Sequence, residues 1–162
     1  MCRALVTIGL VQYNKDDNDA ALATFQRVVD QYATTDEAKQ ALLSIENIYR
    51  DKGDATGYIR YATSTNIGDL STAEQDAHTF SVAKTLFDRG NYQGAVEAIN
   101  AYFDKFPKPI QEKHARFIRG ESYAQLKKDK EAIHDFNIIM NDWTSAYTEQ
   151  TLISVAKLHL RN

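Results

Sequence analysis

Hydrophobic residues recur along most of this chain at intervals of three and four positions, which places them on one face of an α-helix. The segment 20–32 shows the pattern simply, with a stripe formed by Ala21, Phe25 and Val28 among polar residues. A hydrophobic face with this period is typical of an amphipathic helix that packs on a neighbour. Polar segments such as 14–18 (Asn-Lys-Asp-Asp-Asn) interrupt the pattern and predict turns. We therefore expect a series of helices, and no segment indicates a β-strand.

Helix boundaries are marked by capping residues and by proline. Thr34 with Glu37, and Ser71 with Glu74, have the spacing of a capping box, which predicts that a helix begins at each. Residues 106–109 (Phe-Pro-Lys-Pro) predict a stop, because proline is tolerated only in the first turn of a helix. These signals divide the chain into about nine helices. The helices predicted for the second half cover 71–89, 92–105, 110–127, 129–142 and the segment from about 145 onward.

The helical pattern repeats with a period of 37 residues. Four anchor positions separated by this interval hold Gly9, Glu46, Ala83 and Gly120. Twelve residues after the anchors come Ala21, Tyr58, Ala95 and Ala132, and sixteen after them come Phe25, Ala62, Ile99 and Phe136. A fixed period of about 20–50 residues indicates stacked helical units rather than one closed core. We predict a single array over 1–162, with repeats at about 2–34, 35–70, 71–108 and 109–144 and a partial fifth at 145–162.

The composition is ordinary for a folded protein and narrows the classes of partner. Of the 162 residues, 43% are hydrophobic and 25% are charged. The net charge of −3 gives no electrostatic reason to expect nucleic acid or an anionic membrane as a ligand. No stretch approaches the ~20 apolar residues that a membrane-spanning helix needs.

The residue types that carry chemistry predict no catalytic, cofactor-binding or metal site. The single cysteine, Cys2, excludes an internal disulfide and a zinc site made of cysteines. The four histidines lie on different predicted helices, and none has another histidine three or four residues away to share a metal. Glycine-rich phosphate loops, GxSxG and HExxH motifs are absent from the sequence. We expect that the chain is not an enzyme.

Aligned in this register, the units resemble the tetratricopeptide repeat over essentially the whole chain. The fourth unit reads Phe-Ile-Arg-Gly-Glu-Ser-Tyr over 117–123, with Ala132 and Phe136 at the family's small and aromatic positions. The third unit shows Gly-Asn-Tyr at 90–92 and ends with Pro107. The resemblance implies an all-α fold, a right-handed α-solenoid of antiparallel helix pairs A and B. It also implies a scaffold that binds a protein or peptide on the concave surface formed by the A helices.

Several positions depart from the family pattern. Tyr58 stands where the family has alanine and Ala62 where it has an aromatic residue, an exchange that can keep the packed volume constant. We expect a distorted second pair with a short helix B that frays over 63–68. Arg116 and Arg119 occupy positions that are usually apolar in the family.

The resemblance also assigns residues to the concave surface. Val6 and Leu10 belong to this set, as do Tyr13, Leu43, Asn47, Arg50, Phe80, Lys84, Phe87, Phe117 and Glu121. Large apolar side chains with a few polar neighbours would suit an amphipathic helix or an extended peptide. The alternative is that these side chains pack against one another in a tightly wound superhelix.

The carboxylate clamp of chaperone-docking family members is not expected here. Those members hold a peptide's terminal carboxylate with lysine and asparagine at groove positions of several repeats. In this chain only Asn47 and Lys84 match, while Val6, Leu10 and Phe80 stand at other clamp positions. One cation and one amide cannot form a multidentate grip on a carboxylate.

Two short segments of the sequence indicate a cellular compartment. Residues 25–32 and 102–107 resemble bacterial cell-envelope members of the family, such as the periplasmic coordinator of the Tol–Pal system and the helical lipoprotein of the outer-membrane β-barrel assembly machinery. The resemblance implies a periplasmic or envelope scaffold, with the cytoplasm as the alternative.

The sequence leaves a second function open, namely a regulatory or sensory helical domain within a larger envelope enzyme or transcription factor.

The last predicted helix carries an apolar face with no polar helix after it. Its apolar residues are Leu152, Ile153, Val155, Ala156, Leu158 and Leu160. Because the end of a solenoid needs a polar outer face for solubility, this face predicts cover by a further helix or self-association with another copy. We also expect that both ends of the chain fall inside a repeat of a longer array.

Overall fold

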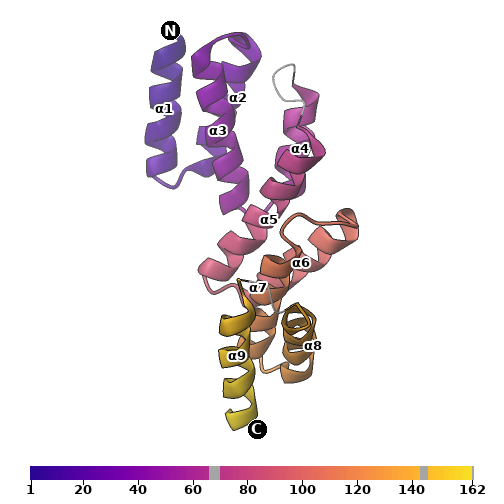
Figure 1. Cartoon of the computed structure of the whole chain (residues 1–162). Helices are drawn as coiled ribbons and strands as arrows, with labels where there is room; N and C mark the ends of the chain where they lie inside the picture. Colours follow the sequence, from indigo (N-terminus) through magenta and orange to yellow (C-terminus); the bar gives the residue numbers. More distant parts are fainter. Residues whose placement is uncertain (66–69, 143–145, 162) are drawn as a thin grey trace. The chain divides into compact units, whose positions relative to one another are not determined.

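A computed structural model describes residues 1–65, 70–142 and 146–161 of the chain (Figure 1). These residues form nine α-helices and no β-strand, which confirms the all-α prediction. The helices are α1 (Cys2–Asn14), α2 (Asn18–Gln31), α3 (Asp36–Asp51), α4 (Ala55–Ser64), α5 (Thr72–Asp88), α6 (Tyr92–Lys105), α7 (Glu112–Gln125), α8 (Asp129–Met140) and α9 (Thr148–Arg161). They divide into two compact units, Met1–Gln75 and Asp76–Asn162, each described by itself below.

Side chains at the predicted breaks cap the helices. Ser71 and Glu74 form the expected capping box, because the Ser71 hydroxyl accepts from the Glu74 N–H and the Glu74 carboxylate accepts from the Ser71 N–H. The predicted cap at Thr34 is wrong by one residue. The Thr35 hydroxyl accepts from the Ala38 N–H at 3.2 Å instead, since Thr35 has the extended backbone of a capping residue.

The turns between paired helices share one backbone conformation. A positive φ occurs at Asp16 (60°), Gly53 (72°), Gly90 (75°) and Lys127 (61°), and these residues are 37 positions apart. Glycine adopts this left-handed conformation freely, whereas a residue with a side chain loses roughly 1 kcal/mol. The two turns without glycine therefore keep the same shape at an energetic cost.

Two anchor positions of the repeat, Gly9 and Gly120, lie directly against an aromatic ring of the paired helix. A Cβ atom added to Gly9 would lie 2.6 Å from Cε1 of Phe25, and one added to Gly120 would lie 2.5 Å from Cε1 of Phe136. Both phenylalanine rings are fully buried. In α1–α2 and α7–α8 the missing side chain thus makes room for the aromatic ring sixteen residues later.

The second helix pair keeps a packed core because a large and a small residue have exchanged positions. Tyr58 is buried, with its ring 6.4 Å from that of Tyr49, and Ala62 has no exposed surface. Its helix B, α4, has 10 residues, against 14 in α2 and α6. The predicted fraying concerns 63–68, and residues 66–68 lie outside the described residues.

A buried carboxylate ties together three helices of the second unit. The Tyr102 hydroxyl of α6 donates to Oδ1 of Asp76 on α5 at 2.6 Å. The Ile110 N–H donates to the other oxygen of Asp76 at 3.0 Å, and the Gln111 N–H donates to the Tyr102 oxygen at 3.1 Å. The chain after Pro109 is therefore fixed where it enters α7, which begins at Glu112 rather than at 110.

Arg116 and Arg119 stand at apolar family positions because a buried acid compensates them. Asp135 of α8 is 1% exposed and accepts from both Nε and Nη2 of Arg119 at 2.7 Å and from Arg116 at 3.3 Å. Each guanidinium also lies about 5 Å from the ring of Phe103 on α6. Arginine thus joins α6, α7 and α8 where the family has hydrophobic contacts.

Gly120→Ala should destabilise the second unit by about 1–3 kcal/mol, because the new methyl group overlaps the buried Phe136 ring. The same change in an exposed helix would stabilise it by roughly 1 kcal/mol, so the sign identifies the close approach. Urea unfolding measures the difference. In a Phe136→Leu background the penalty should shrink, and an unchanged penalty would contradict this packing.

Asp135→Ala should lower the free energy of unfolding by about 2–4 kcal/mol, since it removes the buried carboxylate that two partly buried arginines share and leaves Arg116 with Glu112 alone. Asp104→Ala on the exposed side of α6 is the control and should change stability by less than roughly 0.5 kcal/mol. Equal effects of the two substitutions in chemical denaturation would show that Asp135 has no such role.

Candidate functional site

In the first unit, α1 and α3 are neighbouring A helices that run in the same direction. At their N-terminal ends Nε of Arg3 donates to Oε1 of Glu37 at 3.0 Å. At their C-terminal ends the Tyr13 hydroxyl donates to Oδ2 of Asp51 at 2.5 Å. Contacts at both ends align the helices over their length, with α2 packed on both (Figure 1).

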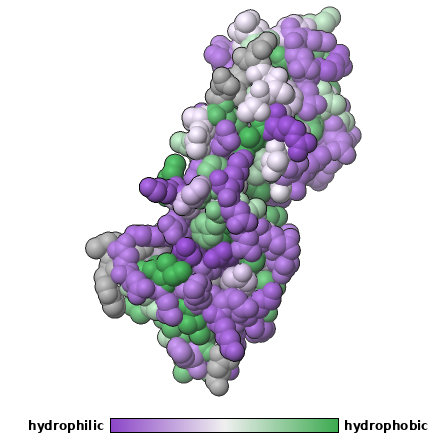
Figure 2. Space-filling view, turned by 90° about the vertical axis from the view of Figure 1, so that its right-hand side faces the viewer, coloured by the Kyte–Doolittle hydropathy of each residue, from purple (hydrophilic) through white to green (hydrophobic). Residues whose placement is uncertain are grey.

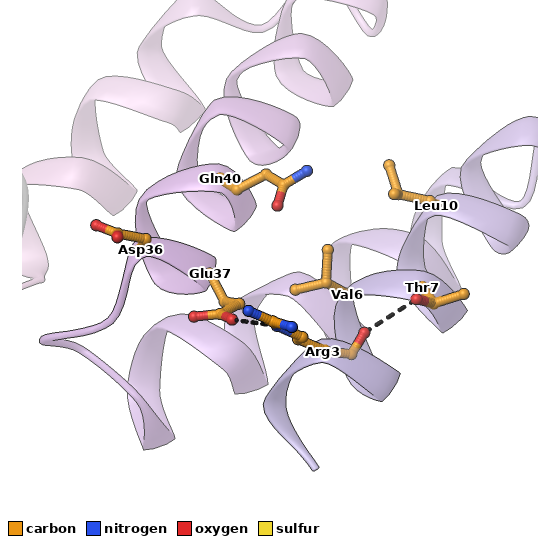
Figure 3. A pocket seen from close by; sticks show the side chains of 7 residues that line it. All are labelled: Arg3, Val6, Thr7, Leu10, Asp36, Glu37 and Gln40. Atoms are coloured by element: carbon orange, nitrogen blue, oxygen red, sulfur yellow. Dashed lines mark hydrogen bonds and ion pairs between the residues drawn. The ribbon is translucent and has the colours of Figure 1, made fainter.

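A groove of about 380 Å³ lies between α1 and α3 (Figure 3). The lining residues are Arg3, Val6, Thr7 and Leu10 of α1 and Asp36, Glu37 and Gln40 of α3. Val6 is 5% exposed and Leu10 is half-buried, so these two side chains form an apolar floor. The groove therefore combines an apolar floor with polar side chains on both edges.

The predicted surface residues of the first unit continue this arrangement along the helices. Leu43 and Asn47 follow Gln40 by three and seven residues, which keeps them on the same side of α3. Leu43 is 62% exposed, and Nη2 of Arg50 donates to Oδ1 of Asn47 at 2.5 Å. Tyr13, one turn beyond Leu10 on α1, binds Asp51 as described above.

In the second unit the predicted surface residues are engaged with neighbouring helices. Phe80 is only 7% exposed, and its ring lies 6.0 Å from Tyr102 and 4.9 Å from His114. Its burial corrects its assignment to an open surface, because the ring fills the space between helices of the core. Phe117 is half-buried against Phe136 and Tyr147.

The remaining predicted residues of the second unit have partners within it. Phe87 is half-buried with its ring 5.8 Å from that of Tyr92. Nζ of Lys84 pairs with Asp88 at 2.6 Å. The carboxylate of Glu121 accepts from the Ser154 hydroxyl of α9.

Sequence reasoning missed the N-terminal end of the groove. The sequence predicts Glu37 as a capping residue, but its carboxylate accepts a hydrogen bond from Arg3 of the neighbouring A helix. The signal was available in the register, since Gln40 follows Arg3 by one period, as Leu43 follows Val6. Extending the predicted concave surface by one helical turn toward the N-terminus of each A helix adds both Arg3 and Gln40.

The first and last helices carry exposed hydrophobic side chains outside the groove. Ile8 and Val11 of α1 are 49% and 47% exposed, and Leu152 and Ile153 of α9 are 45% and 50% exposed. On the face drawn in Figure 2, hydrophilic residues predominate on both units and hydrophobic residues form patches among them. Self-association through α9 stays a prediction.

In the part of the chain that the structure describes, no three His, Cys, Asp or Glu side chains come together in a way that could hold a metal ion. None of the helices described is long and apolar enough to cross a membrane.

Comparison with known proteins identifies repeats of one kind. Two models described as tetratricopeptide repeat match the chain, at residues 3–35 and 82–138. Among curated proteins, no relative matches the sequence.

A solved structure shares the fold at low sequence identity. A tetratricopeptide repeat protein from Parabacteroides merdae is 17% identical, with a TM-score of 0.52 over 99% of this chain and 60% of that one. The chain thus spans 60% of the length of that protein. A structure of MamA is 17% identical, with a TM-score of 0.49 over 94% of this chain and 82% of the other.

The imidazole of His114 should make stability depend on pH. Burial against Phe80 and Tyr147, with Lys84 nearby and Asp88 opposing, holds the pKa of His114 below its ordinary value. The unfolded chain then binds this proton at a higher pH than the folded chain, so stability falls as the pH drops below about 6.5.

Urea midpoints at pH 7.5 and 5.5 test this, with His114→Phe as the variant that cannot titrate. The drop in midpoint between the two pH values should be smaller for the variant than for the wild type. The other three histidines are common to both proteins, so an equal drop would assign the effect to them.

Proposed function

Because the chain belongs to the tetratricopeptide repeat family, we propose that it is a non-catalytic scaffold that binds a protein or peptide through the groove between α1 and α3. Repeats of this family generally mediate interactions between proteins. The groove is the observation that carries the proposal, since it opens between two A helices and joins an apolar floor to polar edges.

The apolar side chains supply the driving force for binding. Leu43 is 62% exposed on the α3 side, and Leu10 is half-buried on the α1 side. Moving a leucine-sized side chain fully out of water contributes about 1.5–3 kcal/mol. A ligand side chain that covers these residues and the floor formed by Val6 therefore gains affinity from contact area.

The polar side chains at the edges of the groove orient the bound segment. The Gln40 side chain extends from α3 toward α1, on the opposite side from Thr7 (Figure 3). A glutamine amide donates and accepts hydrogen bonds at once, as a peptide backbone requires. An extended segment lying between the helices would pair its backbone with this amide while its side chain covers Val6 and Leu10.

Gln40→Trp should block the groove without disturbing the core, because Gln40 is exposed. A library of random dodecapeptides is selected on the immobilised 162-residue chain, and the enriched peptides are titrated against variants. Gln40→Trp should weaken binding at least roughly tenfold, equivalent to about 1.4 kcal/mol.

Gln150→Trp is the matched control, since it places the same ring at an exposed glutamine of α9 in the other unit. It should leave the affinity within about twofold of the wild type. Peptides that bind Gln40→Trp as tightly as the wild type would remove the groove as the binding surface.

A further inference from the structure

Equivalent positions in the two units indicate which side chain of a ligand the groove accepts. We propose that the groove takes an aromatic side chain, phenylalanine or tyrosine, whose ring occupies the place that the ring of Tyr147 takes against α7 in the second unit. The inference rests on the proposed function and adds the chemistry of the ligand to it.

The groove between α1 and α3 corresponds in register to the space between α7 and α9, three periods of 37 residues later. Each lining residue has an equivalent there. The pairs that concern the ring are Arg3 with His114, Val6 with Phe117 and Asp36 with Tyr147. Because equivalent side chains start from equivalent points of a repeat, the two spaces can be compared residue by residue.

In the second unit an aromatic ring lies at the start of α9 and packs on α7. The ring of Tyr147 stacks on that of His114, with centroids 4.9 Å apart, and on that of Phe117, with centroids 5.7 Å apart. The planes of these pairs differ by 25° and 28°, so the phenol ring lies nearly flat against both. The neighbouring helices α5 and α7 also meet through rings, those of Phe80 and His114. Twice in this unit, therefore, neighbouring A helices are joined by aromatic rings.

In the first unit the position of Tyr147 carries a short side chain that turns outward. The side chain of Asp36 is 96% exposed and points away from the other lining residues (Figure 3). The groove of about 380 Å³ is thus bounded by the equivalents of the three stacked residues, with no ring among them. A dry cavity of roughly 150 Å³ already admits benzene. The groove therefore has room for a ring that its own lining does not supply.

The floor of the groove offers carbon surface to such a ring. Val6 is 5% exposed, and Leu10 is half-buried one turn further along α1. An aromatic side chain has about 150–250 Å² of surface to bury, more than other apolar side chains bring. Contact with this floor therefore favours a ring over a small aliphatic group.

Arg3 offers the ring a second kind of contact. Its Nε donates to Glu37 at 3.0 Å, and its side chain is 91% exposed (Figure 3). Because that hydrogen bond lies in the plane of the guanidinium, the faces of the group stay available for stacking on a ring. Two other guanidinium groups of this chain already lie about 5 Å from an aromatic ring. Arg3 can thus take the role that the imidazole of His114 has beside Tyr147.

Sequencing the dodecapeptides selected on the wild-type chain is the first test. Phenylalanine or tyrosine should be enriched at one position of the aligned peptides. In the tightest peptide with phenylalanine there, exchange for alanine should weaken binding at least roughly tenfold, and exchange for leucine at least roughly threefold. Exchange for cyclohexylalanine, which keeps the size and removes the π-system, should weaken binding by roughly two- to fivefold.

Two variants of the protein connect the ring with the groove. Arg3→Met keeps a long side chain but removes the guanidinium, so it should bind the phenylalanine and cyclohexylalanine peptides within about twofold of each other. Arg27→Met is the matched control, since Arg27 is an exposed arginine of α2 that does not line the groove. It should keep the difference that the wild type shows between the two peptides.

The outcomes separate this inference from the proposed function. Selected peptides that share no aromatic position, or equal affinity for the phenylalanine and leucine peptides, overturn the ligand chemistry while Gln40→Trp still blocks binding. A difference between phenylalanine and cyclohexylalanine that Arg3→Met leaves unchanged overturns the placement of the ring beside Arg3. Binding that Gln40→Trp does not affect overturns the proposed function and this inference together.

Discussion

The close approach of two helices at a residue without a side chain is the constraint on which the other features depend. Gly9 and Gly120 each allow a buried phenylalanine to lie against the partner helix, where a single methyl group would overlap the ring. Because each contact joins positions sixteen residues apart, it fixes how the two helices of a pair are aligned. The pairs then present their A helices side by side, and the space between α1 and α3 follows from that alignment.

The turn between paired helices supports the same alignment from the backbone. Gly53 and Gly90 take a left-handed conformation, and Asp16 and Lys127 take it at the equivalent positions despite their side chains. Such strain persists where the surrounding packing requires one geometry. In each hairpin, the packing requires helix B to fold back so that the residue sixteen positions after the anchor faces the anchor. Local backbone and tertiary contact thus specify one hairpin, which is the consistency expected of a foldable sequence.

Sequence reasoning predicted the fold well because periodicity reports which residues face a partner helix. It recovered the nine helices, the anchors and the exchange of Tyr58 and Ala62, all of which depend on spacing and size. It could not predict contacts between residues far apart in the chain, whose partners depend on side-chain reach. The pairing of Arg119 with Asp135 and of Arg3 with Glu37 belongs to this class. A periodic pattern places each of these residues on a face but does not name its partner.

Whether the space between two A helices becomes a groove or a core depends on the side chains at equivalent positions. Arg3, Gln40 and His114 share one register position, and Val6, Leu43, Phe80 and Phe117 share another. In the second unit the ring of His114 lies between those of Phe80, to which it is tilted, and Tyr147, on which it stacks, with both centroid distances 4.9 Å. In the first unit valine, leucine and glutamine occupy these positions, and they are too small or too flexible to close it. Side chains at equivalent register positions therefore pack against one another in the second unit and line a groove in the first.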